Sequence, residues 1–509
     1  MSHKIIKFEK LFFIPISLFF IIKFLQNVNV QKYFYGDDTW LLLGSRFSSI
    51  EESLRCCAVS HPLFTLFAQF SFKFFNYSTE NTILFFVIFS NLILLSIYSL
   101  RKTQLNYLVL AISHVFLLSS PMIIQYSVRT KPYIVDAVIT VLVVSIFYSL
   151  HEKSSKLNYF ILGLLLLISV SSWPVILSVL VITFYQNIRG QDWTKVLNML
   201  YFLPGLIISF LQIVRWKDPG MQNFVIAYYA PTEGGPALFL RWLYFSFLRF
   251  FGESNKLDLG FFEIRLSIII PIFAMGYYVA FKKHKNLFIL FNMALFINLI
   301  AACLKIWPFG GFRSSIYLVP LFCLVAAIGL EFLLSQISKP ELRYLIFLVF
   351  SSYLFAVSAN PNYEQTTRPF NNEKYSEVLE IINSSDSDIL IYHGGLQTTA
   401  LYTEKDIYLE DVSYFQPGSG TEGFHIPQFK DNNIHLACTY YLGKDKGKSC
   451  YQQNVSFLSS FEKNEIVLTG VHIRSHQFEP YLNAFKDMGW EQKDYFYSDE
   501  VAIISFVLP

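Results

Sequence analysis

Residues 11–43 read LFFIPISLFFIIKFLQNVNVQKYFYGDDTWLLL, a long apolar run that leads into an acidic pair and then into a second apolar segment. The part from 11 to 30 is long enough to cross a bilayer, which takes about 20 apolar residues in a helix. Lys4, Lys7 and Lys10 precede it, and flanking basic residues favour the cytoplasmic side. Because no small-residue cleavage site follows, we interpret this run as a retained helix with a cytoplasmic N-terminus.

The whole chain has the composition of an integral membrane protein. Of its 509 residues, 53% are hydrophobic, 18% are aromatic and only 15% are charged, against about 25% charged in an ordinary globular protein. This excludes an all-soluble enzyme, a disordered protein and a coiled coil. Residues 1–358 hold 29 Lys and Arg against 16 Asp and Glu, whereas residues 359–509 hold 11 against 21. This difference in charge predicts that the two parts of the chain lie in different physical environments. Nothing in the charge distribution indicates a nucleic-acid partner.

Ten further apolar runs bring the predicted total to about 11 transmembrane helices. They are residues 81–100, 105–120, 132–150, 157–171, 173–187, 195–214, 262–281, 286–306, 312–334 and 341–358. With the N-terminus inside, five short basic connections fall on the cytoplasmic side, while the long loops and most of the acids fall outside. An odd number of spans then places residues 359–509 outside the membrane.

Two shorter apolar stretches, 62–75 and 237–251, carry basic residues within them. We interpret both as interfacial helices on the outer leaflet, because long basic side chains can reach the polar surface from there. If either stretch spans the membrane instead, the tail moves to the inside.

The tail is predicted to be a small soluble α/β domain. The expected helices are residues 373–383 and 479–489, and the expected strands are residues 388–392, 407–409, 434–440, 465–473 and 501–507. Cys438 and Cys450 both lie in this domain and could form a disulfide on the outer face; free thiols are the alternative.

Polar residues that could carry chemistry gather at the outer ends of the spans. Asp37 and Asp38 directly follow the first span, and Asp38 could simply cap the next helix. His61 begins the first interfacial stretch and could be an ordinary polar residue at the membrane surface. Both positions lie in the first outer loop, residues 31–80.

The second outer loop carries Arg129 and Lys131, two cations outside the membrane, and then Tyr133 and Asp136. A carboxylate within a span is a functional candidate because burying it is costly, although Asp136 could merely neutralise a neighbouring cation. A later loop ends in Arg313, which could snorkel to a lipid phosphate. Cations suit a lipid phosphate as ligand, and a carboxylate beside them could act as general base on an acceptor hydroxyl.

Four features, taken in order along the chain, resemble the GT-C membrane glycosyltransferases. They are an acidic pair after the first span, a short helix led by His-Pro, a basic-Pro-Tyr motif that opens a later span, and a C-terminal soluble domain. The similarity is greatest to bacterial relatives of the protein O-mannosyltransferases and lipid A aminoarabinose transferases. It covers residues 1–358, while the tail matches only in position. The resemblance implies a GT-C-like catalytic domain over 1–358 and an extracytoplasmic α/β domain over 359–509.

The resemblance also implies roles for individual residues. In that family an acid of the first outer loop is the catalytic base, the donor is a polyprenyl-phosphate sugar, and transfer inverts the anomeric centre. The base then falls on Asp37, with Asp38 sharing that role or orienting the acceptor; the family's second acid is a Glu. The His-Pro-Pro pattern falls on His61-Pro62-Leu63 and loses its second proline. These implied residues are catalytic Asp37 and Asp38, with His61 in substrate binding.

The donor site would be formed by the later loops. The family's Arg-Pro-Tyr pattern falls on Lys131-Pro132-Tyr133, so Lys replaces Arg and supplies charge without a bidentate fork. The stretch 308–313 resembles another family segment and makes Arg313 a second phosphate candidate. The implied donor-phosphate ligands are therefore Arg129, Lys131 and Arg313, with Tyr133 and Asp136 in substrate binding.

The predicted function is an inverting glycosyltransferase of the cell inner (cytoplasmic) membrane, acting on its outer face. Its partners would be a polyprenyl-phosphate-linked sugar, a glycan, lipid or protein acceptor, and membrane lipids. No nucleotide-binding fingerprint, cofactor site or metal site is evident, and the need for a divalent cation stays open. The alternatives are a flippase or transporter of lipid-linked glycans, and a noncatalytic protein that binds a glycan precursor.

Overall fold

The computed structural model describes most of the chain outside the first predicted span. The described residues are 37–57, 61–103, 105–120, 123, 126–127, 129–152, 155–215, 229–231, 235–248, 259–310, 313–358, 372–384, 387–392, 395–413, 425–436, 448–471, 475–498 and 501–509. They form two compact units. The first draws on Leu84–Trp216 and Val225–Thr366, and the second on Asn27–Ile83 and Thr367–Pro509. The predicted span 11–30 lies outside the described residues.

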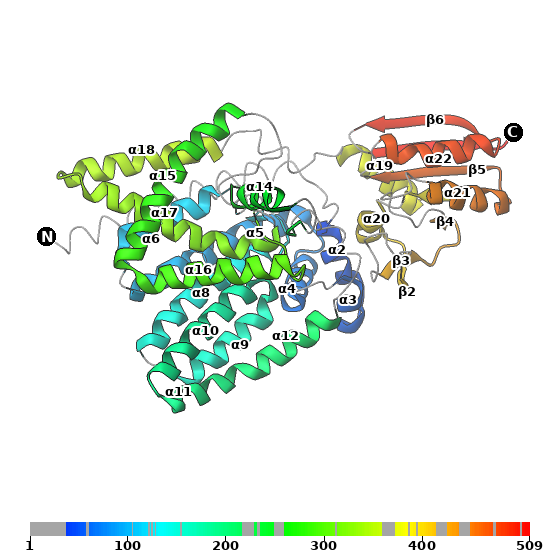
Figure 1. Cartoon of the computed structure of the whole chain (residues 1–509). Coiled ribbons are helices and arrows are strands. Elements are labelled where there is room, and N and C mark those ends of the chain that lie inside the picture. The colour runs from blue at the N-terminus through cyan, green and yellow to red at the C-terminus, as the bar shows by residue number, and fades with distance from the viewer. Residues whose placement is uncertain are drawn as a thin grey trace. The chain divides into compact units, whose positions relative to one another are not determined.

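The first unit is helical (Figure 1). Its elements, where η marks a 3₁₀ helix, are η2 (Leu95–Thr103), α6 (Tyr107–Ser119), α8 (Tyr133–Glu152), α9 (Lys156–Ile168), η3 (Val170–Ser172), α10 (Trp173–Arg189), α11 (Trp193–Asn198), η4 (Met199–Phe202), α12 (Leu203–Arg215), α14 (Gly235–Leu248), α15 (Leu259–Lys283), α16 (Lys285–Cys303), η6 (Arg313–Leu318), α17 (Val319–Ser335) and α18 (Pro340–Ser358). Helix α5 (Thr79–Leu94) begins in the second unit and belongs to the first from Leu84 onward.

Six of the described helical stretches are long and apolar enough to cross a membrane. They are Thr79–Leu100, Tyr133–His151, Val170–Arg189, Trp193–Leu211, Lys285–Cys303 and Ser315–Ser335. Two shorter apolar helices, Tyr107–Ser119 and Lys156–Ile168, occupy the positions of two further predicted spans. The multi-pass helical architecture is therefore confirmed, while the total of about 11 stays a prediction.

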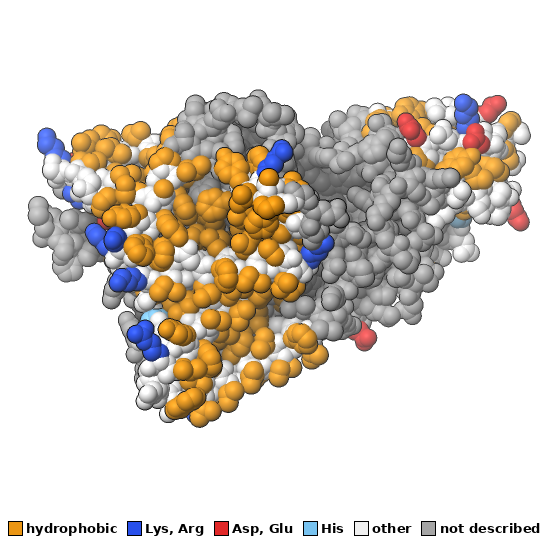
Figure 2. Space-filling model, viewed as in Figure 1, with side chains coloured by type: hydrophobic (Ala, Val, Ile, Leu, Met, Phe, Trp, Pro, Cys, Tyr) orange, Lys and Arg blue, Asp and Glu red, His pale blue; other side chains and the backbone are white. Residues whose placement is uncertain are grey.

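Exposed apolar side chains indicate where lipid would contact the helices. On α12 the side chains of Leu206, Ile207, Phe210 and Leu211 are exposed, Leu211 by 61%. Figure 2 shows such hydrophobic side chains spread over the helices on the face in view. Because a soluble protein rarely exposes contiguous apolar surface on this scale, this surface fits a bilayer environment.

Close helix crossings in this unit depend on glycine. Gly276 on α15 faces α17, where a Cβ would collide with the carbonyl oxygen of Val325, and Gly329 on α17 would collide in the same way with the carbonyl of Ile272. Small residues let two backbones approach closely, which is how helices associate within a membrane.

The second unit combines a helical segment from the first outer loop with the tail. The loop provides α2 (Asp37–Leu43), η1 (Gly44–Arg46), α3 (Ile50–Cys57) and α4 (Pro62–Phe74). The tail provides α19 (Asn372–Ser384), β1 (Ile389–Ile391), α20 (Leu396–Tyr402), β2 (Ile407–Ser413), β3 (His425–Phe429), β4 (Ile434–His435), α21 (Lys448–Ser460), β5 (Glu465–Val471), α22 (Ser475–Asp487), β6 (Glu491–Ser498) and β7 (Val501–Val507).

The tail is an α/β sandwich built on a five-stranded sheet of order β4-β1-β5-β7-β6. Strand β1 runs parallel to β4 and β5, whereas β7 is antiparallel to β5 and β6. Successive side chains of a strand point to opposite faces. Accordingly Ile389 and Ile391 pack with α19 and α20, while Leu390 and Tyr392 pack with α21 and α22.

The tail prediction is confirmed in outline and corrected in detail. Strand 501–507 and the helix at 373–383 are found, but the helix placed at 479–489 begins at Ser475 and ends at Asp487. The predicted strand 434–440 contributes only Ile434–His435, and its end lies outside the described residues. The elements α20, β3, α21 and β6 were not predicted.

Candidate functional site

The candidate acids open a well-anchored helix. Asp37 and Asp38 form the first turn of α2, so the helix begins at Asp37 and not after Asp38 as the capping interpretation supposed. Their side chains lie outside the described part of the structure. At the other end of the helix, the Gln69 side chain of α4 donates to the Leu41 carbonyl at 2.9 Å, and the Ser53 hydroxyl of α3 donates to the Gly44 carbonyl at 2.7 Å.

One set of α2 side chains is packed into the interior of the second unit. Leu42 and Leu43 are fully buried, and Thr39 is also fully buried. A carboxylate in the first turn of a helix is favoured by the helix dipole, so a structural role for the acids is compatible with their position as well.

His61 lies at the N-cap position of α4, followed by Pro62 at the first helical position. Its side chain is 2% exposed, so it is buried within the second unit and is not the surface residue that the simpler interpretation allowed. The His61 carbonyl accepts the first helical hydrogen bond from Thr65 N at 2.9 Å.

The predicted phosphate-binding segment leads into α8. The rings of Tyr126 and Tyr133 meet edge to face at 4.6 Å, and the Arg129 guanidinium lies 6.0 Å from the centroid of the Tyr126 ring. Arg129 and Lys131 are both partly exposed. An aromatic face attracts a guanidinium and restricts its position, so Arg129 lies against a tyrosine pair to which the predicted Tyr133 belongs.

Asp136 is fully buried one turn further along α8. The Ser169 hydroxyl donates to its Oδ1 at 2.6 Å, and Ser169 shares a hydrogen bond of 2.7 Å with Ser172. Ser172 in turn donates to the backbone carbonyl of Asp136 at 3.2 Å. The sequence analysis missed both serines. A signal was present in Ser169-Val170-Ser171-Ser172, a run of hydroxyl residues between two apolar helices.

Arg313 opens η6, and its side chain lies outside the described part of the structure. Helix η6 packs against α8. Tyr317, one turn after Arg313, is fully buried and close enough to Asp136 for that carboxylate to act on its hydroxyl electrostatically. The structure thus brings together α8, which Lys131 precedes, and η6, which Arg313 opens.

The backbone at Gly310, in the segment before Arg313, requires a glycine. Its φ of +108° lies in a region that other residues rarely adopt, and a Cβ there would approach the Ser246 side chain of α14 to 2.9 Å. Next to it, Asn298 and Ser315 both donate to the Pro308 carbonyl, at 3.3 and 3.2 Å. The segment before η6 is therefore held on several sides.

An open apolar hollow of ≈ 400 Å³ lies beside this segment, between α14 and α16. Its lining residues include Leu243, Tyr244, Phe247, Phe296, Leu299 and Phe309. Among the residues that the structure describes, no group of three His, Cys, Asp or Glu side chains could hold a metal ion.

Solved membrane proteins share this architecture along the whole chain. ArnT from Cupriavidus metallidurans in the apo state has a TM-score of 0.54 and 10% identity, over 97% of each chain. ArnT bound to undecaprenyl phosphate has a TM-score of 0.52 and 9% identity, again over 97% of each chain. The arabinofuranosyltransferase AftD from Mycobacteria has a TM-score of 0.52 and 9% identity, covering 97% of this chain and 40% of that chain.

The chain has the GT-C fold. This confirms the fold that the motifs implied. No protein-family model and no curated protein sequence matches the chain. At such identities the likeness establishes the fold, and one fold can carry different activities. The roles of individual residues in this chain therefore rest on its own chemistry.

Proposed function

We propose that this GT-C protein is an inverting glycosyltransferase that moves a sugar from a polyprenyl-phosphate donor to an acceptor hydroxyl on the outer face of the membrane. The observation that carries the proposal is the match to membrane glycosyltransferase structures over 97% of the chain, helices and tail together. One of those structures was solved with undecaprenyl phosphate, a polyprenyl phosphate.

In the proposed reaction Asp37 is the general base. It takes the proton of the acceptor hydroxyl as that oxygen forms a bond to C1 of the sugar. The bond from C1 to the phosphate oxygen breaks, and its electron pair leaves with polyprenyl phosphate. Attack from the face opposite the leaving group inverts C1. Asp38 shares the proton transfer or orients the acceptor.

The first unit would hold the donor. Arg129, Lys131 and Arg313 are proposed to bind the phosphate, where cations stabilise the charge that develops on the leaving group. The hollow beside the Arg313 segment is large and apolar enough for part of a polyprenyl chain. Tyr133 and Asp136 would contact the donor from the start of α8, and His61 would line the acceptor side.

The proposed topology has about 11 spans, a cytoplasmic N-terminus and an extracytoplasmic tail in a bacterial inner membrane. Two observations support it. The basic connections fall on one side of the predicted spans. Cys450 is disulfide-bonded, and disulfides persist in oxidising compartments outside the cytoplasm. We propose Cys438 as its partner, because both cysteines lie in the tail, as the sequence predicted.

The test is a glycan profile by mass spectrometry of cells that lack the gene, complemented with wild type, with an Asp37→Asn, Asp38→Asn double variant, and with Glu51→Gln. Glu51 is an exposed acid of the same loop and serves as the matched control. We expect wild type and Glu51→Gln to restore a missing sugar, whereas the expressed double variant does not. Full restoration by the double variant would contradict the catalytic assignment and favour transport or binding.

A further inference from the structure

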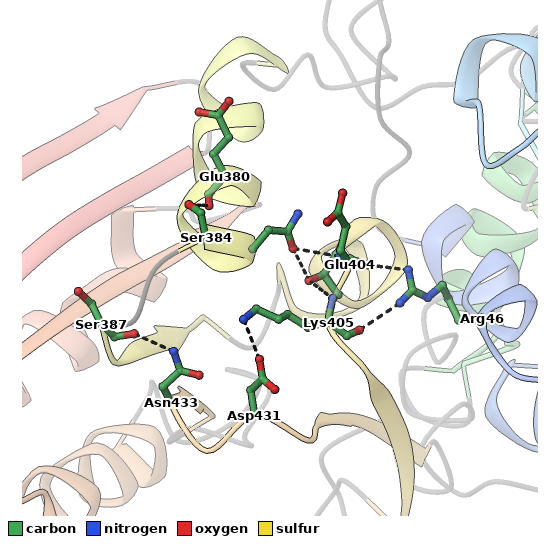
Figure 3. Close-up of polar contacts among 10 residues, drawn as sticks. Arg46, Glu380, Ser384, Ser387, Glu404, Lys405, Asp431 and Asn433 are labelled. Atoms are coloured by element: carbon green, nitrogen blue, oxygen red, sulfur yellow. Dashed lines mark hydrogen bonds and ion pairs between the residues drawn. The ribbon is translucent and has the colours of Figure 1, made fainter.

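Arg46 connects the first outer loop to the tail within the second unit. It is the last residue of η1, which follows α2 without an intervening loop. Its Nη1 donates to the Thr403 carbonyl at 2.5 Å and its Nη2 donates to the Lys405 carbonyl at 3.1 Å. Figure 3 shows the guanidinium directed at the backbone between α20 and β2. A planar guanidinium that donates from both amino groups fixes the orientation of η1 relative to these two carbonyls as well as the distance between them.

The backbone turn that Arg46 binds is itself held in place. The side-chain oxygen of Asn383, at the end of α19, accepts from the Thr403 hydroxyl at 2.8 Å and from Glu404 N at 3.0 Å. The Lys405 ammonium forms an ion pair with Asp431 at 2.8 Å, also visible in Figure 3. The two carbonyl oxygens are therefore presented by a rigid part of the tail.

A second contact reinforces the first. The Tyr402 hydroxyl, at the end of α20, shares a hydrogen bond of 2.6 Å with Thr79 of the loop, and its ring packs edge to face on Phe72 at 6.2 Å. Helix α20 also packs directly against α2. The tail thus contacts α2 itself and the residues that follow it.

Burial lowers the pKa of Arg46, while the nearby Tyr77 and Asp406 raise it in part. A guanidinium stays charged across the ordinary pH range, so its two carbonyl partners cannot be removed without leaving a partly buried cation unpaired. Helix α2 cannot shift along its axis unless these bonds and those of Gln69 and Ser53 break.

We propose that Arg46 is a positioning residue for the transfer reaction, through which the tail holds in place the helix that Asp37 opens. The inference rests on the proposed function of Asp37 as base. It gives the tail a defined role, because anchoring α2 at its end keeps the carboxylates at its start in one position. A base displaced by about 1 Å can lose roughly a hundredfold in rate.

The test compares full-length wild type, Arg46→Ala, Arg46→Lys and Tyr402→Phe, with Lys430→Ala as control. Lys430 forms an exposed ion pair with Asp406 beside the same turn. Hydrogen exchange followed by mass spectrometry reports the mobility of residues 37–46, and donor titration separates kcat from KM.

For Arg46→Ala we expect exchange in residues 37–46 to rise roughly tenfold, as for loss of a hydrogen bond to a charged group, with β5 unchanged. We expect kcat to fall about ten- to a hundredfold while the donor KM stays within about threefold, since the donor cations lie in the other unit. Arg46→Lys and Tyr402→Phe should be intermediate, and Lys430→Ala should match wild type.

Unchanged exchange in residues 37–46 of folded Arg46→Ala would overturn the proposal, as would a loss confined to the donor KM. If Arg46→Ala does not fold, the same criteria apply to Tyr402→Phe, which keeps the ring packing. If wild type shows no transfer but Arg46→Ala still accelerates exchange, the anchoring stands and the proposed function fails.

Discussion

Asp136 in the helical unit and Arg46 in the second unit find their hydrogen-bond partners at very different separations along the chain. In the helical unit the Asp136 carboxylate is bound by Ser169, only 33 positions away in the sequence. In the second unit the Arg46 guanidinium is bound by carbonyls 357 and 359 positions away. The Asp136 contact therefore forms between nearby segments of the chain. The second unit is complete only when the first outer loop meets the tail, so the candidate base depends on the far end of the chain.

The largest expected difference between the units is in catalysis. Asp37→Asn should lower transfer about 10²- to 10⁴-fold, because an amide cannot accept the acceptor proton. Asp136→Asn should cost only about tenfold, because the amide oxygen can still accept from Ser169. Transfer assays with donor titration on both purified variants check this, and the Asp136→Asn loss should fall mainly on the donor KM. A larger loss for Asp136→Asn would assign the base to the helical unit.

A smaller effect is expected where α15 and α17 cross. Gly329→Val places a side chain against the Ile272 carbonyl and should destabilise the helical unit by about 1–3 kcal/mol or more. Thermal unfolding of the purified protein measures this, with Leu333→Val, an exposed position on the same helix, as control. The tail should keep its own unfolding transition; if both transitions drop together, the two units do not fold separately.

The smallest of the three effects concerns Asp388 in the tail. Burial raises the pKa of this carboxyl, but hydrogen bonds from His435 at 2.8 Å and Lys463 at 2.5 Å outweigh burial and lower it overall. A lowered pKa stabilises the fold above the ordinary Asp pKa of about 3.9, and that stability is lost as the pH falls through the lowered pKa.

Asp388→Asn should therefore cost about 1–3 kcal/mol at pH 7, and the cost should shrink as the pH falls below about 4. Unfolding of the tail between pH 7 and pH 3 provides the measurement. A cost that does not depend on pH would show that packing, and not charge, accounts for the role of Asp388.

The sequence predicted the helices better than the tail, for physical reasons. A membrane span is marked by a long apolar run, so α8, α10 and α16 were placed within a few residues. Strand β6 reads EQKDYFYS and exposes most of its side chains at the sheet edge. It therefore lacks the alternation of apolar and polar residues by which a half-buried strand is recognised in a sequence. Helix α21 contains four Ser and one Asn, which are weaker helix formers than Ala, Leu or Glu.

The candidate site was predictable only where side chains form a motif. The acidic pair, the Lys-Pro-Tyr segment and Arg313 could be named from spacing and resemblance. Ser169 and Arg46 could not, because their contacts depend on how separate elements pack together. The partners of Arg46 are backbone carbonyls, which any residue at 403 and 405 would supply, so no sequence pattern records that contact.

The most direct test of the central claim uses purified protein in nanodiscs and the lipid fraction from cells that lack the gene, mixed with acceptor. The measurement is the release of polyprenyl phosphate together with the anomeric configuration of the new linkage. We predict that wild type releases polyprenyl phosphate in step with product and inverts the configuration of the donor sugar, while Asp37→Asn releases none. Folded wild type that releases no polyprenyl phosphate, or product with retained configuration, would contradict the account.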